Sequence, residues 1–259
     1  GTVTRKLKLL NTQQYLEMRE EAFANDGITT LPSWAYDVNG TWDKNRYTDW
    51  QKELIGGTSV SRNVEAGVSG GTGTTQFLIR GTNFNETTVF PGDFNYGKSA
   101  LHFNINHTSE DNRFAINLSG NYVADKNNLM STDLTRNAST LAPNAPALYD
   151  ENGNLNWENA TWDNPLRLLQ GKYLAKTKGL YLGGLMSYKL LPNLEFKSAL
   201  GYNDTRVEES STSPHTIYNP AFGLTSAASS SMINNSIQQS WSVEPQLNYL
   251  KSIGKAKLN

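Results

Sequence analysis

Three histidines are the residues best suited to metal binding or to proton transfer near neutral pH. The residue pattern puts His102 on the polar face of a predicted strand, His107 on the other face at the end of that strand, and His215 in a long connection. A zinc site needs several such ligands at one point. This spacing therefore favours structural roles or positions facing a wet interior, and it predicts no metal centre.

A second group of polar residues imitates part of a calcium-binding loop. Asp150, Asn152 and Asn154 stand where such loops carry their first ligands, but Gly153 is misplaced and Thr161 replaces the closing Glu. A plain two-residue hairpin turn at Asn152-Gly153 explains these residues better. The sequence also shows no Ser-His-Asp arrangement and no glycine loop able to cradle a phosphate. We therefore predict neither enzyme activity nor a bound cofactor.

Four tryptophans remain as candidates for ligand binding. They lie in long segments outside the predicted strands, where flat apolar rings could stack on sugar rings or on peptide side chains. The alternative is that these rings pack the loops together and against a covering partner. The predicted substrate-binding residues are Trp34, Trp42, Trp157 and Trp162.

The elements that carry these loops are predicted to be strands. From Ser99 to His107 apolar residues alternate with Asn and His, and Phe114 to Tyr122 repeats the alternation after a polar turn at Thr108–Asn112. This stretch, Lys98–Ala124, predicts an antiparallel hairpin around which the chain is organised. Its second face is rich in Asn, His and Ser without being charged, which suits a wet interior better than an open surface.

The rest of the chain repeats this design. Pro245 lacks a ladder donor and predicts a bulge or a pairing defect. In the segment around Asn152-Gly153, the turn places Leu148 across from Trp157. One clear helix is predicted, at Asn11–Asn25, with Asn11 or Thr12 as its N-cap. Further strands are predicted at Val60–Ser69, Thr74–Asn85, Lys178–Leu190, Leu194–Asn203 and Ser236–Tyr249, followed by a turn at Lys251–Lys255 and an unfinished strand.

The connections alternate in length. Because consecutive antiparallel strands reverse direction, all short turns are expected at one end of the sheet and all long loops at the other. Outer-membrane barrels have this asymmetry, with short periplasmic turns and long extracellular loops. Short turns are predicted at Gly70–Gly73, Thr108–Asn112, Leu191–Asn193 and Lys251–Lys255, and long connections at Glu86–Gly97, Asp125–Thr177 and Asp204–Asn235.

The composition is compatible with a membrane barrel. The 259 residues carry a net charge of -1, which offers no basic field for nucleic acid. The absence of cysteine excludes disulfides and thiolate metal sites. No apolar run reaches the length of a membrane-spanning helix, about 18 residues. The mean hydropathy is low, -0.55, but barrels share this property because every second strand residue faces the lumen.

The positions of the aromatic residues predict two rows with an aliphatic band between them, as in the aromatic girdles of outer-membrane barrels. Seven strands and a stub cannot close such a barrel, so we predict an all-β fold: a segment of seven to eight strands of a larger antiparallel transmembrane β-barrel. A soluble β-sandwich or solenoid with an aromatic buried face is the alternative. The predicted rows are Phe114, Tyr188, Phe196 and Tyr249 near short turns, and Phe84, Tyr122 and Tyr202 near long loops.

Eight sequence runs occur in order along nearly the whole chain: NTQQYLEM (11–18), TDWQKELI (48–55), VEAGVSGG (64–71), FPGDF (90–94), PNAPALYDENGNLNW (143–157), LEFKSALGYN (194–203), TSPHTIYNPA (212–221) and EPQLNY (244–249). In order and spacing these runs resemble the SusC/RagA family of TonB-linked outer-membrane transporters of Bacteroidetes. None of the runs is a catalytic motif.

The resemblance implies a barrel of about 22 strands with an N-terminal plug, capped by a SusD-like lipoprotein. It also implies TonB-driven import of oligosaccharides or peptides, and a parent complex that forms a homodimer. The plug and the TonB-contacting segment would belong to parts of a longer polypeptide. In this reading residues 1–59 are an extracellular loop with a short helix and residues 60–259 hold the strands. A passive surface-binding or adhesive outer-membrane protein is the alternative function.

Overall fold

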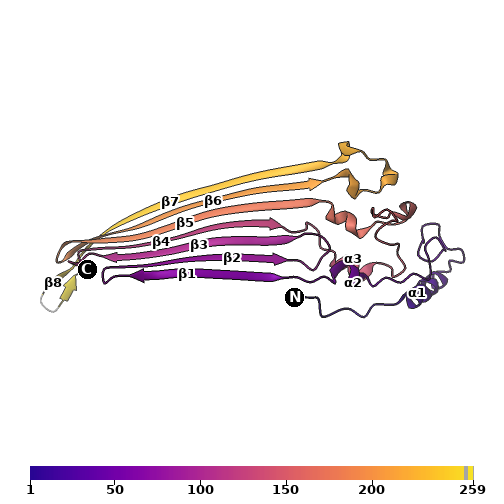
Figure 1. The fold of residues 1–259 in the computed structure, drawn as a ribbon, viewed down its shortest axis with the longest axis horizontal. Helices are drawn as coiled ribbons and strands as arrows, with labels where there is room; N and C mark the ends of the chain where they lie inside the picture. Colours follow the sequence, from indigo (N-terminus) through magenta and orange to yellow (C-terminus); the bar gives the residue numbers. More distant parts are fainter. Residues whose placement is uncertain (254–255, 259) are drawn as a thin grey trace.

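A computed structural model of the chain describes residues 1–253 and 256–258. Seven strands form one antiparallel sheet in which each strand pairs with the next in the chain (Figure 1). This confirms the predicted all-β antiparallel fold. The strands are β1 (Ser61–Gly71), β2 (Thr75–Thr87), β3 (Asn95–Thr108), β4 (Phe114–Asn128), β5 (Lys172–Leu191), β6 (Leu194–Ser213) and β7 (Ser230–Tyr249), with a separate pair, β8 (Lys251–Ile253) and β9 (Ala256–Leu258).

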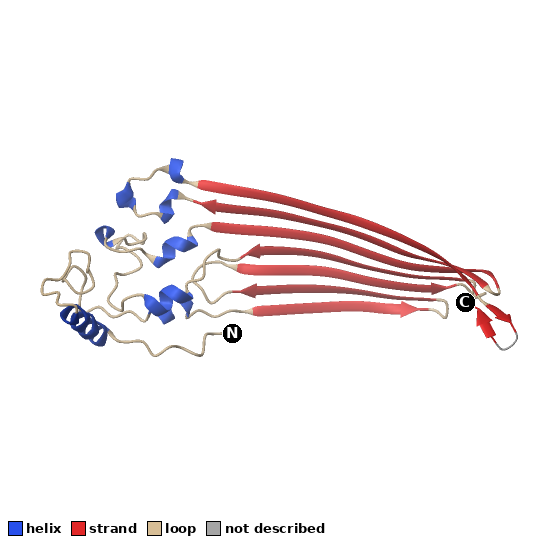
Figure 2. Cartoon of the chain, turned by 180° about the vertical axis from the view of Figure 1, so that it is seen from behind, coloured by secondary structure: helices blue, strands red, loops and turns tan. Residues whose placement is uncertain are grey.

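The predicted sorting of connections is confirmed. Residues 72–74, 109–113 and 192–193 connect strands at one end of the sheet, and residues 88–94, 129–171 and 214–229 connect them at the other. Figure 2 shows the helices gathered at the end that carries the long connections, while the described C-terminal strands lie at the opposite end. The long connections therefore lie next to one another at one end of the sheet.

Several predicted strand ends are wrong because the strands continue further. The register of β6 with β7 runs without a break to the pair Ser213 and Ser230, so half of the predicted connection Asp204–Asn235 is strand. Apart from Val207, Met232 and Ile233 these extensions are polar, and so few apolar residues give no alternation to detect. β3, β4 and β5 also extend into the predicted connections Glu86–Gly97 and Asp125–Thr177 and shorten them.

Two details near the short-turn end also differ from the prediction. Pro245 causes no register shift, since it lies directly opposite Ser198 in the continuous ladder of β6 and β7. The ladder of β6 and β7 therefore accommodates a residue without an N–H donor at this position. The predicted turn at Lys251–Lys255 begins as strand β8, and its residues 254–255 lie outside the described residues.

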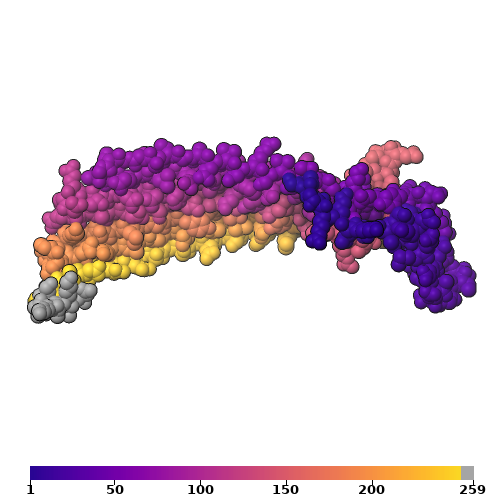
Figure 3. Space-filling model, turned by 90° about the horizontal axis from the view of Figure 1, so that it is seen from below, coloured from indigo at the N-terminus to yellow at the C-terminus, as the bar shows by residue number. Residues whose placement is uncertain are grey.

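The two faces of the sheet differ in chemistry. On the apolar face, Leu101 and Val243 keep 47% and 52% of their surface exposed, while Phe103 and Ile116 are half-buried. Within the described residues no second layer of protein covers this face, and Figure 3 shows a sheet one layer thick with loops massed at one end. A soluble sandwich would bury these side chains, so the exposed apolar face speaks against that alternative.

The register corrects the predicted aromatic row near the long loops. Phe84 lies opposite Asn63 and Lys98, on the polar face, where its ring packs at 6.2 Å from Tyr96. Tyr202 lies within β6, far from the connection that follows Ser213. The row near the short turns is regular, since Tyr188 is directly opposite both Phe114 and Phe196.

The largest hydrophobic core lies in the connections, not under the sheet. Two helices missed by the sequence analysis, α2 (Trp50–Ile55) and α3 (Thr135–Thr140), pack there, and the rings of Trp50 and Trp162 lie 6.0 Å apart. The prediction of a single helix is therefore wrong, because six-residue helices are too short to show a helical period. No helix in the described residues is long and apolar enough to cross a membrane.

The predicted helix is confirmed as α1 (Thr12–Asn25), with Asn11 as its N-cap in a capping box with Gln14.

A buried carboxylate attaches the helix to the next segment. Asp37, 8% exposed, accepts hydrogen bonds from Arg19 Nε at 2.7 Å and from the Tyr15 hydroxyl at 2.9 Å. Burial acts to raise the pKa of Asp37, but the bonds from Arg19 and Tyr15 outweigh it and lower that pKa. Burial and the bond to Asp37 raise the pKa of Tyr15 to about 12.

Replacing Asp37 with Asn should loosen α1. The substitution leaves the Arg19 guanidinium without its carboxylate, so we expect local opening of α1 to become easier by about 1–3 kcal/mol. Hydrogen exchange of the α1 amides measures this as lower protection, and Glu21→Gln on the exposed side of the same helix is the matched control.

The pH dependence follows from the same contacts. Because the pKa of Asp37 is lower in the folded state than its value of about 3.9 in the unfolded chain, the ionised carboxylate stabilises the fold fully above that pH. This contribution is lost as the pH falls below about 3.9 and through the lowered pKa of the folded state. The raised pKa of Tyr15 stabilises α1 below about pH 10 and is lost as the pH rises towards 12. Protection of α1 that stays constant from pH 7 to pH 3 would contradict this account.

Candidate functional site

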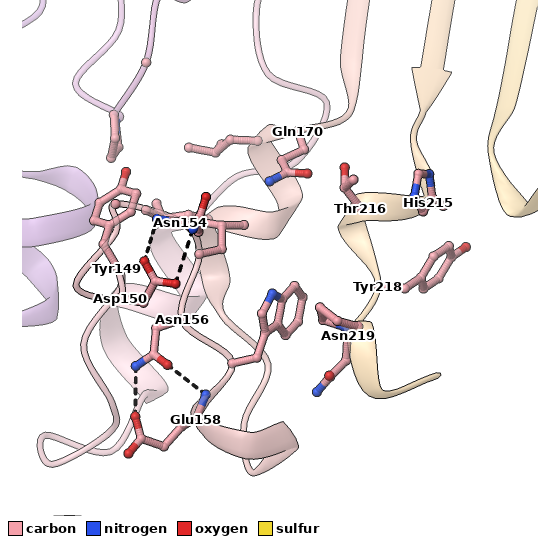
Figure 4. A pocket seen from close by; sticks show the side chains of 18 of the residues that line it. Tyr149, Asp150, Asn154, Asn156, Glu158, Gln170, His215, Thr216, Tyr218 and Asn219 are labelled. Atoms are coloured by element: carbon pink, nitrogen blue, oxygen red, sulfur yellow. Dashed lines mark hydrogen bonds between the residues drawn. The ribbon is translucent and has the colours of Figure 1, made fainter. Parts of the chain in front are cut away.

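The three long connections line a pocket of about 1220 Å³. Figure 4 shows Tyr149 and Asn156 from connection 129–171 on one side, and His215 and Tyr218 from connection 214–229 on the other, with Gln170 between them. Residues 91–94 of the connection before β3 complete the lining. The pocket therefore depends on all three connections having the same strand end as their base.

The lining combines amides, hydroxyls and aromatic rings with few charges. Asn154, Asn156 and Gln170 offer paired donors and acceptors, and Tyr149, Trp157 and Tyr218 offer flat apolar surfaces. Such a surface can hydrogen-bond the hydroxyls of a sugar or the amides of a peptide while a ring packs on the ligand.

The hairpin turn in this wall differs slightly from the prediction. Asp150 N donates to Asn154 O and Gly153 N to Asp150 O, so the loop has three residues, with Gly153 in the left-handed region at φ +81°. Leu148 O therefore accepts from Asn156 N, and the predicted pairing of Leu148 with Trp157 is wrong by one residue. The loop is one residue longer than predicted because the Asp150 carboxylate accepts hydrogen bonds from the N–H groups of Asn152 and Asn154.

These bonds also explain the residues that imitate a calcium loop. The backbone N–H of Asn154 is the main cause that lowers the pKa of Asp150, and the carboxylate thus caps its own turn. No group of three His, Cys, Asp or Glu side chains that could hold a metal ion occurs in residues 1–253 and 256–258. Of the histidines, His215 lines the pocket and His107 bonds Thr75 through Nδ1 at 2.8 Å.

Directly after Trp157 the backbone takes a left-handed turn, η1 (Glu158–Ala160). Its three residues have φ of +41°, +52° and +67°, although none is glycine. Left-handed conformation costs roughly 1–2 kcal/mol for each such residue. Local bonds offset this cost: Ala160 N donates to Trp157 O at 2.8 Å, and Asn156 and Glu158 exchange two bonds, drawn in Figure 4. Strain of this kind is concentrated at functional sites.

A buried asparagine fixes the base of the same wall. Asn164 has no exposed surface, and its amide donates to Leu148 O at 2.6 Å and to Asn156 O at 3.0 Å. Its oxygen accepts from Leu166 N and caps η2 (Pro165–Leu169). The sequence analysis missed this residue, although Asn followed by Pro is a helix-start signal.

The four predicted tryptophans are not brought together. Trp157 lines the pocket, whereas Trp34 is 64% exposed elsewhere, beside Phe23 of α1. Trp42 donates from Nε1 to Thr161 Oγ1 at 2.9 Å and packs against the loop core. Trp162 belongs to that core and is 7% exposed. In this conformation Trp157 alone of the four meets the pocket.

No protein-family model matches the sequence, and no curated protein matches it. Solved structures do share the fold. The RagAB peptide importer in its closed-closed state matches 95% of this chain with a TM-score of 0.68 and 14% identity. The open-open state of the importer matches 96% of this chain with a TM-score of 0.68 and 15% identity. A structure of the RagAB peptide transporter matches 95% of this chain with a TM-score of 0.67 and 13% identity.

These similarities concern the fold, because the sequence identities are low. The present chain spans 30–31% of the length of the matched chains. The chain therefore shares the fold of part of the matched RagAB chains, and its all-β antiparallel sheet is consistent with the predicted barrel segment.

Glycine at position 160 should stabilise the turn beside Trp157. Ala160 has φ +67°, which glycine adopts without a steric penalty. We expect Ala160→Gly to raise the free energy of unfolding by up to about 1 kcal/mol, measured as a higher thermal midpoint. At Ala22, inside α1, the same substitution should lower it by a similar amount. Equal destabilisation at both positions would show that the turn is not strained.

Proposed function

We propose that this chain forms part of the membrane-embedded wall of an outer-membrane, TonB-dependent transporter that imports oligosaccharides or peptides. One observation carries the proposal: the sheet exposes an apolar face along strands β1 to β7 while its other face is polar. Val68, Ile79, Phe103, Leu182 and Trp241 all lie in one cross-strand row on the apolar face. In water such a face would drive aggregation, whereas lipid is its natural solvent.

The register supports this orientation. The row of Phe114, Tyr188 and Phe196 lies near the short turns, and the opposed pair Tyr202 and Trp241 lies further along the same face. The aliphatic side chains between them are Ile116, Leu118, Leu200 and Val243, and those beyond the pair are Leu101, Leu180 and Ile237. Aromatic girdles at both interfaces are a property of outer-membrane barrels. In the proposal the polar face lines a water-filled lumen.

The remaining parts of the transporter are assigned by the same proposal. The edges β1 and β7 pair with further strands of a longer polypeptide, since unpaired strand edges are not stable in lipid. Residues 1–59 with α1 and α2 form an extracellular part, and residues 60–259 hold the membrane strands. A SusD-like surface lipoprotein covers the long connections, the TonB complex acts through N-terminal parts, and the complex dimerises. RagAB is described as a peptide importer, which favours peptides as the first ligands to test.

Of the four predicted tryptophans, Trp157 and Trp34 are the proposed contacts to substrate or lid, while Trp42 and Trp162 support the loop core. Trp157 is best placed to touch a substrate in the pocket, and the exposed Trp34 is best placed to meet a lid. A passive adhesive protein is the second candidate. The exposed Trp34 fits this function equally well, and energised uptake distinguishes the two.

Membrane placement can be tested with two neighbouring residues on opposite faces of β4. Leu118 lies on the apolar face and Asn117 on the polar one. Arginine on a lipid face costs about 2–4 kcal/mol near the bilayer midplane, whereas lumen positions tolerate it. We therefore expect Leu118→Arg to reduce the amount of assembled protein in outer membranes strongly and Asn117→Arg to leave it near wild type. Equal tolerance of both changes would contradict a lipid-facing Leu118.

The substrate role of the pocket is tested by Trp157→Ala. Losing one stacked ring removes roughly 1–2 kcal/mol of binding, so peptide or oligosaccharide uptake at low concentration should fall about tenfold with unchanged protein levels. Tyr47→Ala, an exposed aromatic residue outside this pocket, serves as the control. Uptake by Trp157→Ala that matches the wild type at every concentration would remove this residue from the site.

A further inference from the structure

Three lysines stand together at the long-loop end of the apolar face. The register puts Lys126 of β4 directly opposite Lys176 of β5, and Lys178 lies two residues further along the same face. All three side chains are exposed. Directly opposed residues have Cβ atoms roughly 5 Å apart, and like charges in this position destabilise a sheet. Neither local structure nor pairing accounts for this arrangement.

The acidic residues nearby do not neutralise the cluster. On the same face, Asp204 forms two hydrogen bonds of 3.0 Å with Arg206, which lies opposite Lys178. Glu208 lies opposite Lys176. Among the described residues, none of the three lysines forms an ion pair with a carboxylate. Four cations and two anions leave the patch positive.

On β4 and β5 the cluster follows the main apolar stretch of the face. Lys178 follows Leu180 at the next position on that face, and Lys126 follows Tyr122 at the second position. At about 3.3 Å per residue, with a strand tilt near 45°, the backbone of these lysines stands roughly 5–10 Å beyond Leu180 and Tyr122. Apolar side chains continue on the same face beside and beyond the lysines, at Ile237 and Ile233 of β7 and Leu174 of β5. The headgroup layer of a bilayer is about 5–8 Å thick on each side. Lysine stems can also bend towards the apolar boundary.

We propose that Lys126, Lys176 and Lys178 bind the phosphate of an anionic lipid headgroup in the leaflet on the long-loop side. The chemistry is that of a phosphate held by several ammonium donors. A lipid is the favoured source of this phosphate because the cluster is continuous with the exposed apolar face, which accommodates the acyl chains. This inference rests on the membrane placement proposed above.

The test uses the complete polypeptide that carries this chain, purified in mild detergent. Binding of phosphatidylglycerol and of phosphatidylcholine is measured by native mass spectrometry for the wild type and for Lys126→Gln, Lys176→Gln and Lys178→Gln combined. The matched control combines Lys98→Gln, Lys189→Gln and Lys197→Gln, three lysines on the polar face of the same sheet. Inorganic phosphate at millimolar concentration is added as a competitor in a separate arm.

A charge near an anionic surface changes lipid affinity roughly fivefold for each lysine, so the triple variant should bind phosphatidylglycerol at least tenfold more weakly. Binding of phosphatidylcholine and the behaviour of the polar-face control should be unchanged. Equal loss in the control, no loss in the triple variant, or displacement by inorganic phosphate would each overturn the proposal.

The two proposals fail in distinguishable ways. Wild-type protein that inserts into vesicles but shows no preference for phosphatidylglycerol refutes only the headgroup site. Wild-type protein that does not insert with its strand signal intact refutes the membrane placement, and the headgroup site with it. Circular dichroism of each variant confirms that the strands are formed.

Discussion

The structure depends on the unbroken antiparallel ladder of hydrogen bonds that joins β1 to β7. Every strand exposes apolar side chains on one face, so the sheet gains little stability from a buried core beneath it. In an apolar solvent each unpaired N–H or C=O costs several kcal/mol, and this penalty makes register the dominant constraint. The one register shift in the described part of the ladder, between Lys189 and Leu191, lies beside a short turn at the end of the sheet.

Because the sheet lacks a covering layer, the hydrophobic effect acts mainly in the connections. α2, α3 and the segment around Trp162 form a compact core at the long-loop end. Gln51 of α2 fixes the N-terminal arm to this core, since its side chain accepts from Leu7 N at 2.8 Å and donates to Leu7 O at 2.9 Å. The pocket walls are therefore built on a folded unit with its own core, which suits a site that must keep its shape.

The sequence predicts most of the sheet, because residues such as Leu101 and Asn104 alternate with the period of a strand wherever one face is apolar. It fails beyond Tyr202 in β6, where all residues but Val207 are polar and the alternation carries no signal. Of the candidate site, the sequence indicated Trp157, but Trp162 belongs to the core, and the amides of the pocket, Asn164 and the left-handed turn after Trp157 were missed. These features depend on contacts between segments distant from the strands, which no local pattern encodes.

The polar ends of the long strands have a physical role of their own. From Tyr202 to Ser213, β6 continues for roughly 36 Å at about 3.3 Å per residue, paired throughout with β7. Side chains tie these strands laterally: Glu209 accepts from Tyr173 of β5 at 2.7 Å and from Asn234 of β7 at 2.8 Å. A paired sheet resists bending far better than separate loops would. The strands thus carry the pocket at a fixed distance from the apolar band. In the proposed membrane placement a ligand would be bound in water while the apolar face of the same strands lies in lipid.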